Sequence, residues 1–298
     1  TADLSLHNLD DDKEVAVAVS SSNTSEGTVS PATLTFTEAN WNTAQTVTVT
    51  GVNDNDADGH QDYDISLSAA GDEIDENPLV TTSAGSSLGS TDATGTSAKF
   101  NYPRGVTTDG TNLYVADSKN HRIRKIVIST GVVTTLAGSS QGSTDGTGTS
   151  ASFNMPMGIT TDGTNLYIAG YSSHKIRKVV ISTGVVTTLA GSSSGYTDAT
   201  GTSAKFKNFG GITTDGTNLY VADNGNHRIR KIVIDNGTVT TLAGSSSGFV
   251  DNATGTSARF NGLWGITTDG TNLYVVDREN YRIRKIVIST GVVTTLAG

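Results

Sequence analysis

The chain has 298 residues, with 34 glycines, no cysteine and a formal net charge of −9. Its apolar residues form short runs, well below the roughly 20 consecutive apolar residues that a membrane-spanning helix needs, so no membrane span is expected. The acidic balance argues against nucleic acid as a partner, and a cysteine nucleophile is excluded.

The charge is divided unevenly along the sequence. Residues 1–78 hold 16 acidic residues and one lysine, a net charge of −15, whereas residues 79–298 hold 13 acidic and 19 basic residues, a net charge of +6. Such asymmetry indicates two separate units. The acidic stretch GDEIDENPL at 71–79 fits a linker, and we place the domain boundary after residue 78.

The first domain, residues 1–78, alternates polar and apolar residues in short runs at 4–6, 15–19, 27–37, 45–52 and 63–68. This pattern predicts a small β-sandwich. The stretch TLTFTEANWNTAQTVTVTGVNDNDADGHQDYDISLS at 33–68 resembles the Calx-β-type and related immunoglobulin-like modules of bacterial surface proteins. The resemblance implies an extracellular or cell-surface location and a sandwich that lacks one edge strand.

An acidic loop in this domain has the spacing of a calcium site. The segment DNDADG at 54–59 places carboxylates at alternate positions around a glycine turn, as calcium-binding loops do. The twelfth position is Ile65, so a complete EF-hand is excluded. Calcium is therefore one hypothesis and a solvated acidic hairpin is the other; no further cofactor is expected. The candidate ligands are Asp54, Asp56, Asp58, Asp62 and Asp64.

The second domain, residues 79–298, is an internal repeat of 53 to 54 residues. The octapeptide TTDGTNLY begins at Thr107, Thr160, Thr213 and Thr267. Each repeat contains four β-type runs, and the first two are joined by Asp-Gly, a strong hairpin signal. Four short antiparallel strands followed by a Gly/Ser/Thr-rich connector predict one blade of a β-propeller. The predicted blades are 100–152, 153–205, 206–259 and 260–298.

A further fourth-strand element precedes the first blade. Residues 80–85, VTTSAG, match VTTLAG at the end of each repeat. The sequence therefore contains five candidates for a fourth strand but only four sets of first, second and third strands. Three arrangements fit: part of a longer ring of roughly six blades, a four-bladed ring with a spare strand, or an assembly in which that strand pairs with another chain. We expect the first or the third.

The segments NHRI, SHKI, NHRI and NYRI, which begin at residues 120, 173, 226 and 280, follow YVAD or a variant of it. These motifs resemble the NHL-repeat family, whose members are β-propellers. The resemblance implies that the recurring His and Asp residues are structural. Tyr281 and Gly170 depart from the pattern. The expected structural residues are His121, His174, His227, Asp117, Asp223 and Asp277.

The third strand of each repeat is basic, as in Arg122-Ile-Arg124-Lys125. Aromatic side chains are not interleaved with these cations, so RNA binding, known for some NHL propellers, is not expected. We interpret these Lys and Arg residues as surface side chains whose aliphatic parts lie over the blade edges while their charged ends reach solvent. They could also attract the acidic domain of another copy.

Two loops vary on an otherwise uniform frame. The residues before each first strand differ between repeats, and in a propeller this loop reaches the central mouth. A second variable slot joins strands two and three, at 118–119, 171–172, 224–225 and 278–279. Adjustable ligand contact and drift at tolerant loops both explain the variation. The candidate mouth residues are Tyr102, Arg104, Met155, Met157, Phe209, Leu263 and Trp264.

No catalytic motif is present, and nearly identical blades do not supply different groups around one substrate, so a non-enzymatic protein is expected. The first hypothesis is an extracellular structural or adhesive scaffold that assembles with itself, by strand addition or by contact between acidic sandwich and basic propeller. The alternative is a propeller module that binds a glycan or protein. An NHL-type lyase or hydrolase ranks third.

Overall fold

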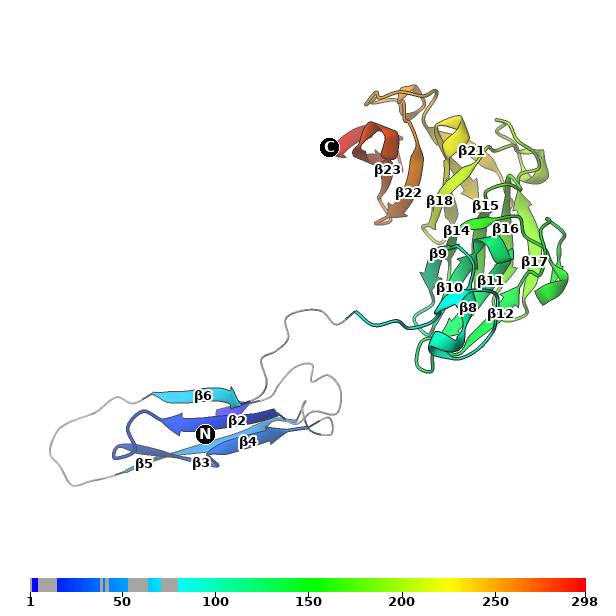
Figure 1. The fold of residues 1–298 in the computed structure, drawn as a ribbon. Helices are drawn as coiled ribbons and strands as arrows, with labels where there is room; N and C mark the ends of the chain where they lie inside the picture. Colours follow the sequence, from blue (N-terminus) through cyan, green and yellow to red (C-terminus); the bar gives the residue numbers. More distant parts are fainter. Residues whose placement is uncertain (1, 5–14, 38–39, 41–42, 53–63, 71–79) are drawn as a thin grey trace. The chain divides into compact units, whose positions relative to one another are not determined.

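The computed structural model describes residues 2–4, 15–37, 40, 43–52, 64–70 and 80–298 (Figure 1). They form two compact units, Thr1–Val80 and Thr81–Gly298. The division falls two residues from the boundary expected from the charge change. The only helices among the described residues are short 3₁₀ turns, and none is long enough to cross a membrane.

The first unit contains two three-stranded antiparallel sheets, with strand orders β1-β5-β3 and β4-β2-β6. Val17, Leu34 and Phe36 from one sheet share a buried apolar cluster with Val47 from the other. The sandwich and its resemblance to Calx-β modules stay predictions. The strands are β1 Ala2–Leu4, β2 Val15–Ser21, β3 Gly27–Ser30, β4 Thr33–Phe36, β5 Gln45–Gly51 and β6 Ile65–Ala70.

The second unit, called the blade unit below, contains four antiparallel sheets whose four main strands follow one another in sequence order, as predicted for propeller blades. The second sheet has a fifth, two-residue strand, Gly146–Thr147. The first strands are β9 Pro103–Thr108, β14 Pro156–Thr161, β18 Phe209–Thr214 and β22 Leu263–Thr268. The second strands are β10 Asn112–Asp117, β15 Asn165–Gly170, β19 Asn218–Asp223 and β23 Asn272–Asp277. The third strands are β11 Arg122–Val127, β16 Lys175–Val180, β20 Arg228–Val233 and β24 Arg282–Val287. The fourth strands are β12 Val133–Ala137, β17 Val185–Ala190, β21 Val239–Ala243 and β25 Val293–Ala297.

Short elements lie between these strands. The connectors before the blades, residues 85–102, 138–155, 191–208 and 244–262, each contain a 3₁₀ turn, and three of the loops between second and third strands contain another. The short strands are β7 Ser87–Leu88, β8 Lys99–Phe100 and β13 Gly146–Thr147. The 3₁₀ turns are η1 Gly95–Ser97, η2 Ser118–Asn120, η3 Gly148–Ser150, η4 Gly201–Ser203, η5 Asn224–Asn226, η6 Gly255–Ser257 and η7 Arg278–Asn280.

The repeated octapeptide builds the first hairpin through the side chain of its aspartate. Asp109 Oδ1 accepts hydrogen bonds from the backbone N–H groups of Thr111 and Asn112, at 2.9 and 2.7 Å. Asp109 Oδ2 accepts the Tyr114 hydroxyl proton at 2.7 Å. Gly110 takes a φ of 88°, which a residue without a Cβ adopts at low cost. Most residues of the repeated octapeptide therefore stabilise this one hairpin turn.

A fully buried arginine lies at the centre of each blade. In the first blade Arg124 Nη1 donates to Asp117 Oδ2 at 2.9 Å, and Nη2 donates to Asp92 Oδ1 at 2.6 Å. The guanidinium also donates to two connector carbonyls and lies 4.9 Å from the centre of the Phe100 ring. Burying a charge is unfavourable unless it is paired and hydrogen-bonded, and here almost every donor is used.

The same cluster ties the connector to its blade. Asp92, in the connector, also accepts hydrogen bonds from the backbone N–H and the hydroxyl of Thr135 in β12, at 2.9 and 3.1 Å. One guanidinium and one connector carboxylate thus hold the second, third and fourth strands together. The corresponding connector carboxylates, arginines and threonines are Asp145, Arg177 and Thr188; Asp198, Arg230 and Thr241; and Asp251, Arg284 and Thr295.

The second blade lacks part of this cluster. Gly170 stands where Asp117 lies in the first blade, and Ser173 replaces the asparagine that contacts that aspartate. Arg177 keeps Asp145 at 2.8 Å as its ion-pair partner. Burial lowers the pKa of Arg177, and Asp145 opposes that shift.

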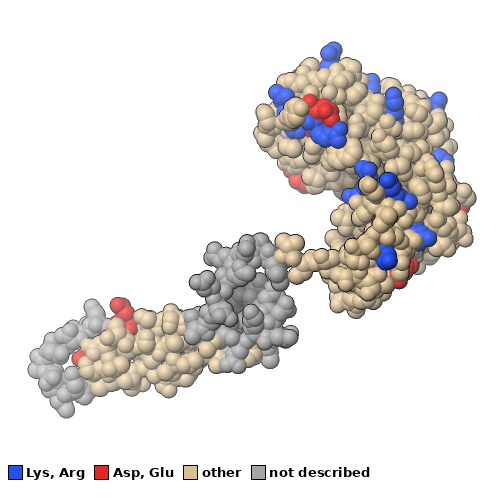
Figure 2. All heavy atoms as spheres, viewed as in Figure 1, with Lys and Arg blue, Asp and Glu red and all other residues tan. Residues whose placement is uncertain are grey.

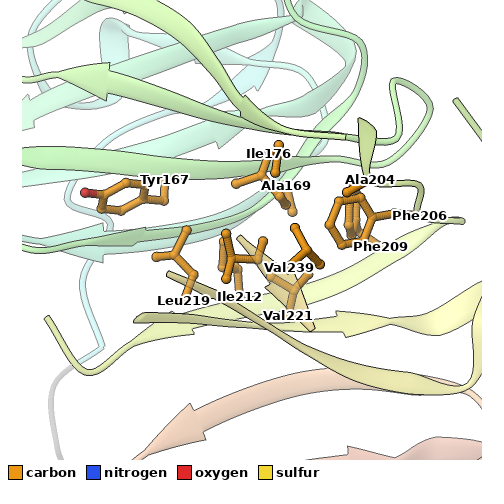
Figure 3. Close-up of a cluster of buried hydrophobic side chains, with 12 residues drawn as sticks. Tyr167, Ala169, Ile176, Ala204, Phe206, Phe209, Ile212, Leu219, Val221 and Val239 are labelled. Atoms are coloured by element: carbon orange, nitrogen blue, oxygen red, sulfur yellow. The ribbon is translucent and has the colours of Figure 1, made fainter. Parts of the chain in front are cut away.

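Neighbouring blades pack face to face through apolar side chains. We call the face toward the following blade the back face and the face toward the preceding blade the front face. Between the second and third blades, Tyr167, Ala169 and Ile176 of the back face meet Leu219 and Val221 of the front face (Figure 3). The first strands β9, β14, β18 and β22 lie next to one another in that order, and the four sheets form an arc (Figure 1).

Two expectations are wrong. Residues 80–85 form no strand, because no third strand of the same repeat precedes them in the sequence. Gly85 N–H still bonds to the Gly95 carbonyl, as the equivalent glycine does after the fourth strand of each of the first three blades. The cations of the third strand do not all extend over the blade edge: Arg124, Arg177, Arg230 and Arg284 are at most 1 % exposed.

Replacing Arg230 by Met removes the charge that compensates Asp223, a carboxylate whose pKa burial raises. We expect the free energy of unfolding to fall by about 3–5 kcal/mol in urea denaturation. The matched control is Lys231→Met, which removes the same charge from the next, half-buried residue and should change it by about 0.5 kcal/mol. Equal losses of unfolding free energy in the two variants would contradict a stabilising role of the buried Arg230–Asp223 ion pair.

Replacing Tyr114 by Phe removes one hydrogen bond from Asp109. Partial burial opposes ionisation of Asp109, but the bonds from Tyr114, Asn112 and Thr111 outweigh it and lower the pKa of that carboxyl below 3.8. Burial and the bond to Asp109 raise the pKa of Tyr114 to about 12. We expect a loss of about 1–2 kcal/mol in the free energy of unfolding at pH 7.

A carboxyl with a lowered pKa stabilises the fold fully above its ordinary value and loses that contribution as the pH falls through the folded value. Because the folded-state pKa of Asp109 lies well below 3.8, the difference between Tyr114→Phe and the unmodified protein should stay nearly constant from pH 7 down to pH 3.8 and shrink only as the pH falls through that lowered value. The control is Tyr102→Phe, at an exposed tyrosine. A loss of stability at pH 7 that is no larger in Tyr114→Phe than in Tyr102→Phe would disprove the role of the bond between the hydroxyl and the carboxylate.

Candidate functional site

The variable residues before each first strand occupy three structurally different positions. The first position has a left-handed backbone in every repeat, with φ between 50° and 73°. The second packs into the blade or covers it, and the third lies on the central channel formed by the first strands. The residues at the three positions are Tyr102, Pro103 and Arg104; Met155, Pro156 and Met157; Asn208, Phe209 and Gly210; and Gly262, Leu263 and Trp264.

Two of the expected mouth residues do not reach the mouth. Phe209 and Leu263 hold the second position, are 0 % exposed and belong to the apolar clusters between blades. The sequence showed that these positions vary but not that the strand turns their side chains inward. The first-position residues Tyr102 and Met155 remain accessible, exposed and half-buried respectively.

The third-position residues come together from different blades. Arg104, Met157 and Trp264 line one cavity of about 180 Å³. Met155 and Tyr171 also line it, together with Ser118. Ser118 and Tyr171 belong to the second variable slot, between strands two and three. Both variable slots thus contribute side chains to one cavity, although they are separated by a strand pair in the sequence.

Glycines at the next position let the first strands approach one another. A Cβ on Gly105 would collide with the Met157 carbonyl, and a Cβ on Gly211 would lie 3.1 Å from the Ile266 nitrogen. These glycines and the neighbouring isoleucines line the channel below the cavity. The repeated glycine is therefore required by close approach of backbones, and the residue before it is free to vary.

Cations lie beside the aromatic side chains of the mouth. Lys119 Nζ is 3.8 Å from the centre of the Tyr102 ring, and the Arg278 guanidinium is 5.1 Å from the Trp264 ring. Arg278 also pairs with Glu279 at 2.5 Å. Arg104 is exposed and lines the cavity. Figure 2 shows Lys and Arg side chains at several places on the visible face of the blade unit.

The expected structural residues do not line this cavity. Asp117, Asp223 and Asp277 are fully buried, and each forms an ion pair with the buried arginine of its blade. His121 Nδ1 accepts the backbone N–H of Met155 in the next blade, at 3.3 Å. Burial lowers the pKa of His121, which favours the neutral ring that this bond requires. His174 and His227 hold the same position and burial lowers their pKa values as well, but their buried Nδ1 atoms have no hydrogen-bond partner among the described residues.

The calcium hypothesis concerns residues that the structure does not describe. Asp54, Asp56, Asp58 and Asp62 lie outside the described residues, and Asp64 is exposed at the edge of that gap. Among the described residues, no group of three His, Asp or Glu side chains is arranged to hold a metal ion. Calcium binding in the first unit stays a prediction.

Sequence comparison finds NHL-repeat proteins that are similar to part of this chain. The family model "NHL repeat" matches residues 100–126. "NHL repeat-containing protein 2" of Homo sapiens is 34 % identical over 144 residues, which cover 44 % of this chain and 20 % of that protein. "Protein SUPPRESSOR OF QUENCHING 1, chloroplastic" of Arabidopsis thaliana is 29 % identical over 225 residues, 67 % of this chain and 21 % of that protein. The chain thus spans about a fifth of the length of these relatives.

Solved structures share the fold at low sequence identity. An auxiliary nutrient binding protein from Bacteroides ovatus superposes with a TM-score of 0.54 at 20 % identity, over 71 % of this chain and 56 % of that one. A chain of a nidogen/laminin complex gives a TM-score of 0.50 at 19 % identity, over 67 % and 65 % of the two chains. The blade unit is thus similar in sequence to NHL-repeat proteins and shares the fold of solved β-propellers.

Proposed function

We propose that the blade unit is a non-enzymatic ligand-binding module whose mouth holds a small organic ligand. The observation that carries this proposal is the convergence of the variable residues. Arg104, Met157 and Trp264 come from three different blades and meet at one cavity, while the residues that lock the blades are nearly invariant between repeats. Concave apolar sites with a few polar groups are the usual form of a small-molecule site.

The lining of the cavity favours a ligand with an apolar face and a carboxylate. Trp264, Tyr171 and the two methionines offer aromatic and thioether surface, on which a sugar ring or an apolar side chain can pack. Arg104 adds a planar cation that binds carboxylates through two parallel hydrogen bonds. A glycan that carries an acidic sugar, or a short acidic peptide, has this chemistry.

The comparisons support the binding hypothesis better than the scaffold hypothesis. The solved structure from Bacteroides ovatus that shares this fold is described as a nutrient binding protein. Its likeness is one of fold, so the ligand proposed here rests on the cavity. The structural or adhesive scaffold and the extracellular location were expected from the sequence, and the comparisons give neither any support.

Replacing Trp264 by Ala removes the largest aromatic surface of the cavity, and replacing Arg104 by Ala removes its cation. We expect each variant to lose at least about tenfold in affinity, or about 1.4 kcal/mol, for the glycans or acidic peptides that the unmodified chain selects from an array. Isothermal titration measures the dissociation constants. The loss for Arg104→Ala should shrink at high salt, where ionic attraction is screened.

The controls remove the same chemical groups from the outer edge of the blades. Tyr196→Ala removes an exposed aromatic ring and Arg122→Ala removes a cation, and neither residue lines the cavity. Both controls should bind as the unmodified chain does. Binding that survives in Trp264→Ala and Arg104→Ala, or that falls equally in the controls, would contradict the proposed site.

A further inference from the structure

Three of the four blades place two carboxylates against one buried arginine. In the first blade Arg124 pairs with Asp117 of the second strand and with Asp92 of the connector. The third and fourth blades repeat this arrangement around Arg230 and Arg284. The repeat therefore normally surrounds its guanidinium with two anions.

The second blade supplies only one of these anions. Gly170 replaces the aspartate of the second strand, so Arg177 pairs with Asp145 alone. The side chain of Arg177 is 1 % exposed, whereas that of Asp145 is 50 % exposed and shares its charge with solvent. A buried cation is unfavourable unless it is paired and fully hydrogen-bonded, so this guanidinium is the least compensated of the four.

Two hydrogen-bond donors lose their acceptor with that carboxylate. In each other blade Nη1 of the arginine donates to a connector carbonyl and to the second-strand aspartate, whereas Arg177 Nη1 donates only to the Ser152 carbonyl, at 2.8 Å. The backbone N–H of Asn101 donates to Asp117 Oδ1 at 2.8 Å. The equivalent N–H, that of Asn154, has no acceptor among the residues that the structure describes.

The second blade keeps the backbone around this position but carries smaller side chains. The second strand pairs with its neighbours at Gly170 in the same register as the other blades do at their aspartate. Ser173 replaces the asparagine that contacts the aspartate elsewhere. Its hydroxyl bonds to the Gly170 carbonyl at 3.2 Å and to neither Arg177 nor Asn154, so it does not stand in for the carboxylate oxygens.

We propose that the second blade binds a small monovalent inorganic anion, of the size of chloride, where the other blades hold the aspartate carboxylate. Arg177 Nη1 and the Asn154 N–H donate to it, as their equivalents donate to the carboxylate. The Ser173 hydroxyl, which rotates freely about its C–O bond, is a third donor. The bound anion restores two negative charges around the guanidinium and completes the buried cluster.

This anion site is separate from the proposed ligand site at the mouth. Neither Arg177 nor Asn154 nor Ser173 lines the mouth cavity. The anion acts on the stability of the second blade, whereas the mouth residues act on the affinity for an organic ligand. Either proposal can therefore fail without the other.

The test measures urea denaturation of the full chain at increasing chloride concentration and constant ionic strength, with gluconate, a much larger anion, as the replacement. An anion that binds only the folded state raises the folding equilibrium constant in proportion to its occupancy of the site. Between about 1 mM and about 200 mM chloride we expect that constant to rise at least about tenfold. Constant ionic strength keeps the screening of other charges unchanged.

Two variants remove the site in different ways, and one control leaves it intact. Gly170→Asp/Ser173→Asn supplies the carboxylate from the chain itself, and Arg177→Met removes the cation; both should lose the chloride response. The control Lys178→Met removes the charge of the next, half-buried residue and should respond as the unmodified chain does.

Binding is read directly from the width of the chloride-35 NMR signal. The unmodified chain and Lys178→Met should broaden this signal more than Gly170→Asp/Ser173→Asn does. A folding constant of the unmodified chain that does not change with chloride would mean that water serves these donors, and it would overturn the proposal. A response or broadening of the same size in Gly170→Asp/Ser173→Asn would be a general salt effect and would overturn it as well.

Discussion

The buried ion cluster at the centre of each blade is the interaction on which the rest of the blade unit depends. In the first blade Arg124 joins Asp117 of the second strand to Asp92 of the connector, and Asp92 continues to Thr135 of the fourth strand. A buried guanidinium without a partner would be strongly unfavourable, and in every blade the arginine keeps the connector aspartate, even in the second blade where Gly170 replaces the second-strand aspartate. The cluster also sets the path of the connector, and hence the position where each first strand begins.

The contacts that each residue makes explain which positions of the repeat are constant and which vary. The constant residues close the hairpin, pair with the arginine or allow backbones to approach, as Asp109, Arg124 and Gly105 do. The residue before that glycine faces the channel, makes no such contact and takes the form of Arg104, Met157, Gly210 or Trp264. A uniform frame thus presents four variable positions around one opening, which is the basis of the proposed binding site.

The sequence was sufficient to predict the blades, because Asp-Gly turns and the 53-residue period fix strand order. It was not sufficient to place Phe209 and Leu263, since a variable position before a strand can face either the channel or the core. It also misled on Arg124, because a basic residue in a strand usually extends to solvent. Two signals were available: an apolar residue, Ile or Val, follows the arginine two positions later on the same face of the strand, and an aspartate recurs about 32 residues before it in every repeat.

The second blade provides the most direct test of the ion cluster. Gly170→Asp/Ser173→Asn installs the Asp–Asn pair of the other blades beside Arg177, and Gly170→Asn/Ser173→Asn installs the same shape without the charge. Urea denaturation should give the aspartate variant a free energy of unfolding about 1–2 kcal/mol above that of the asparagine variant, and the difference should vanish when Arg177 is replaced by Met. An aspartate variant no more stable than the asparagine variant would contradict the view that this ion cluster locks the blade.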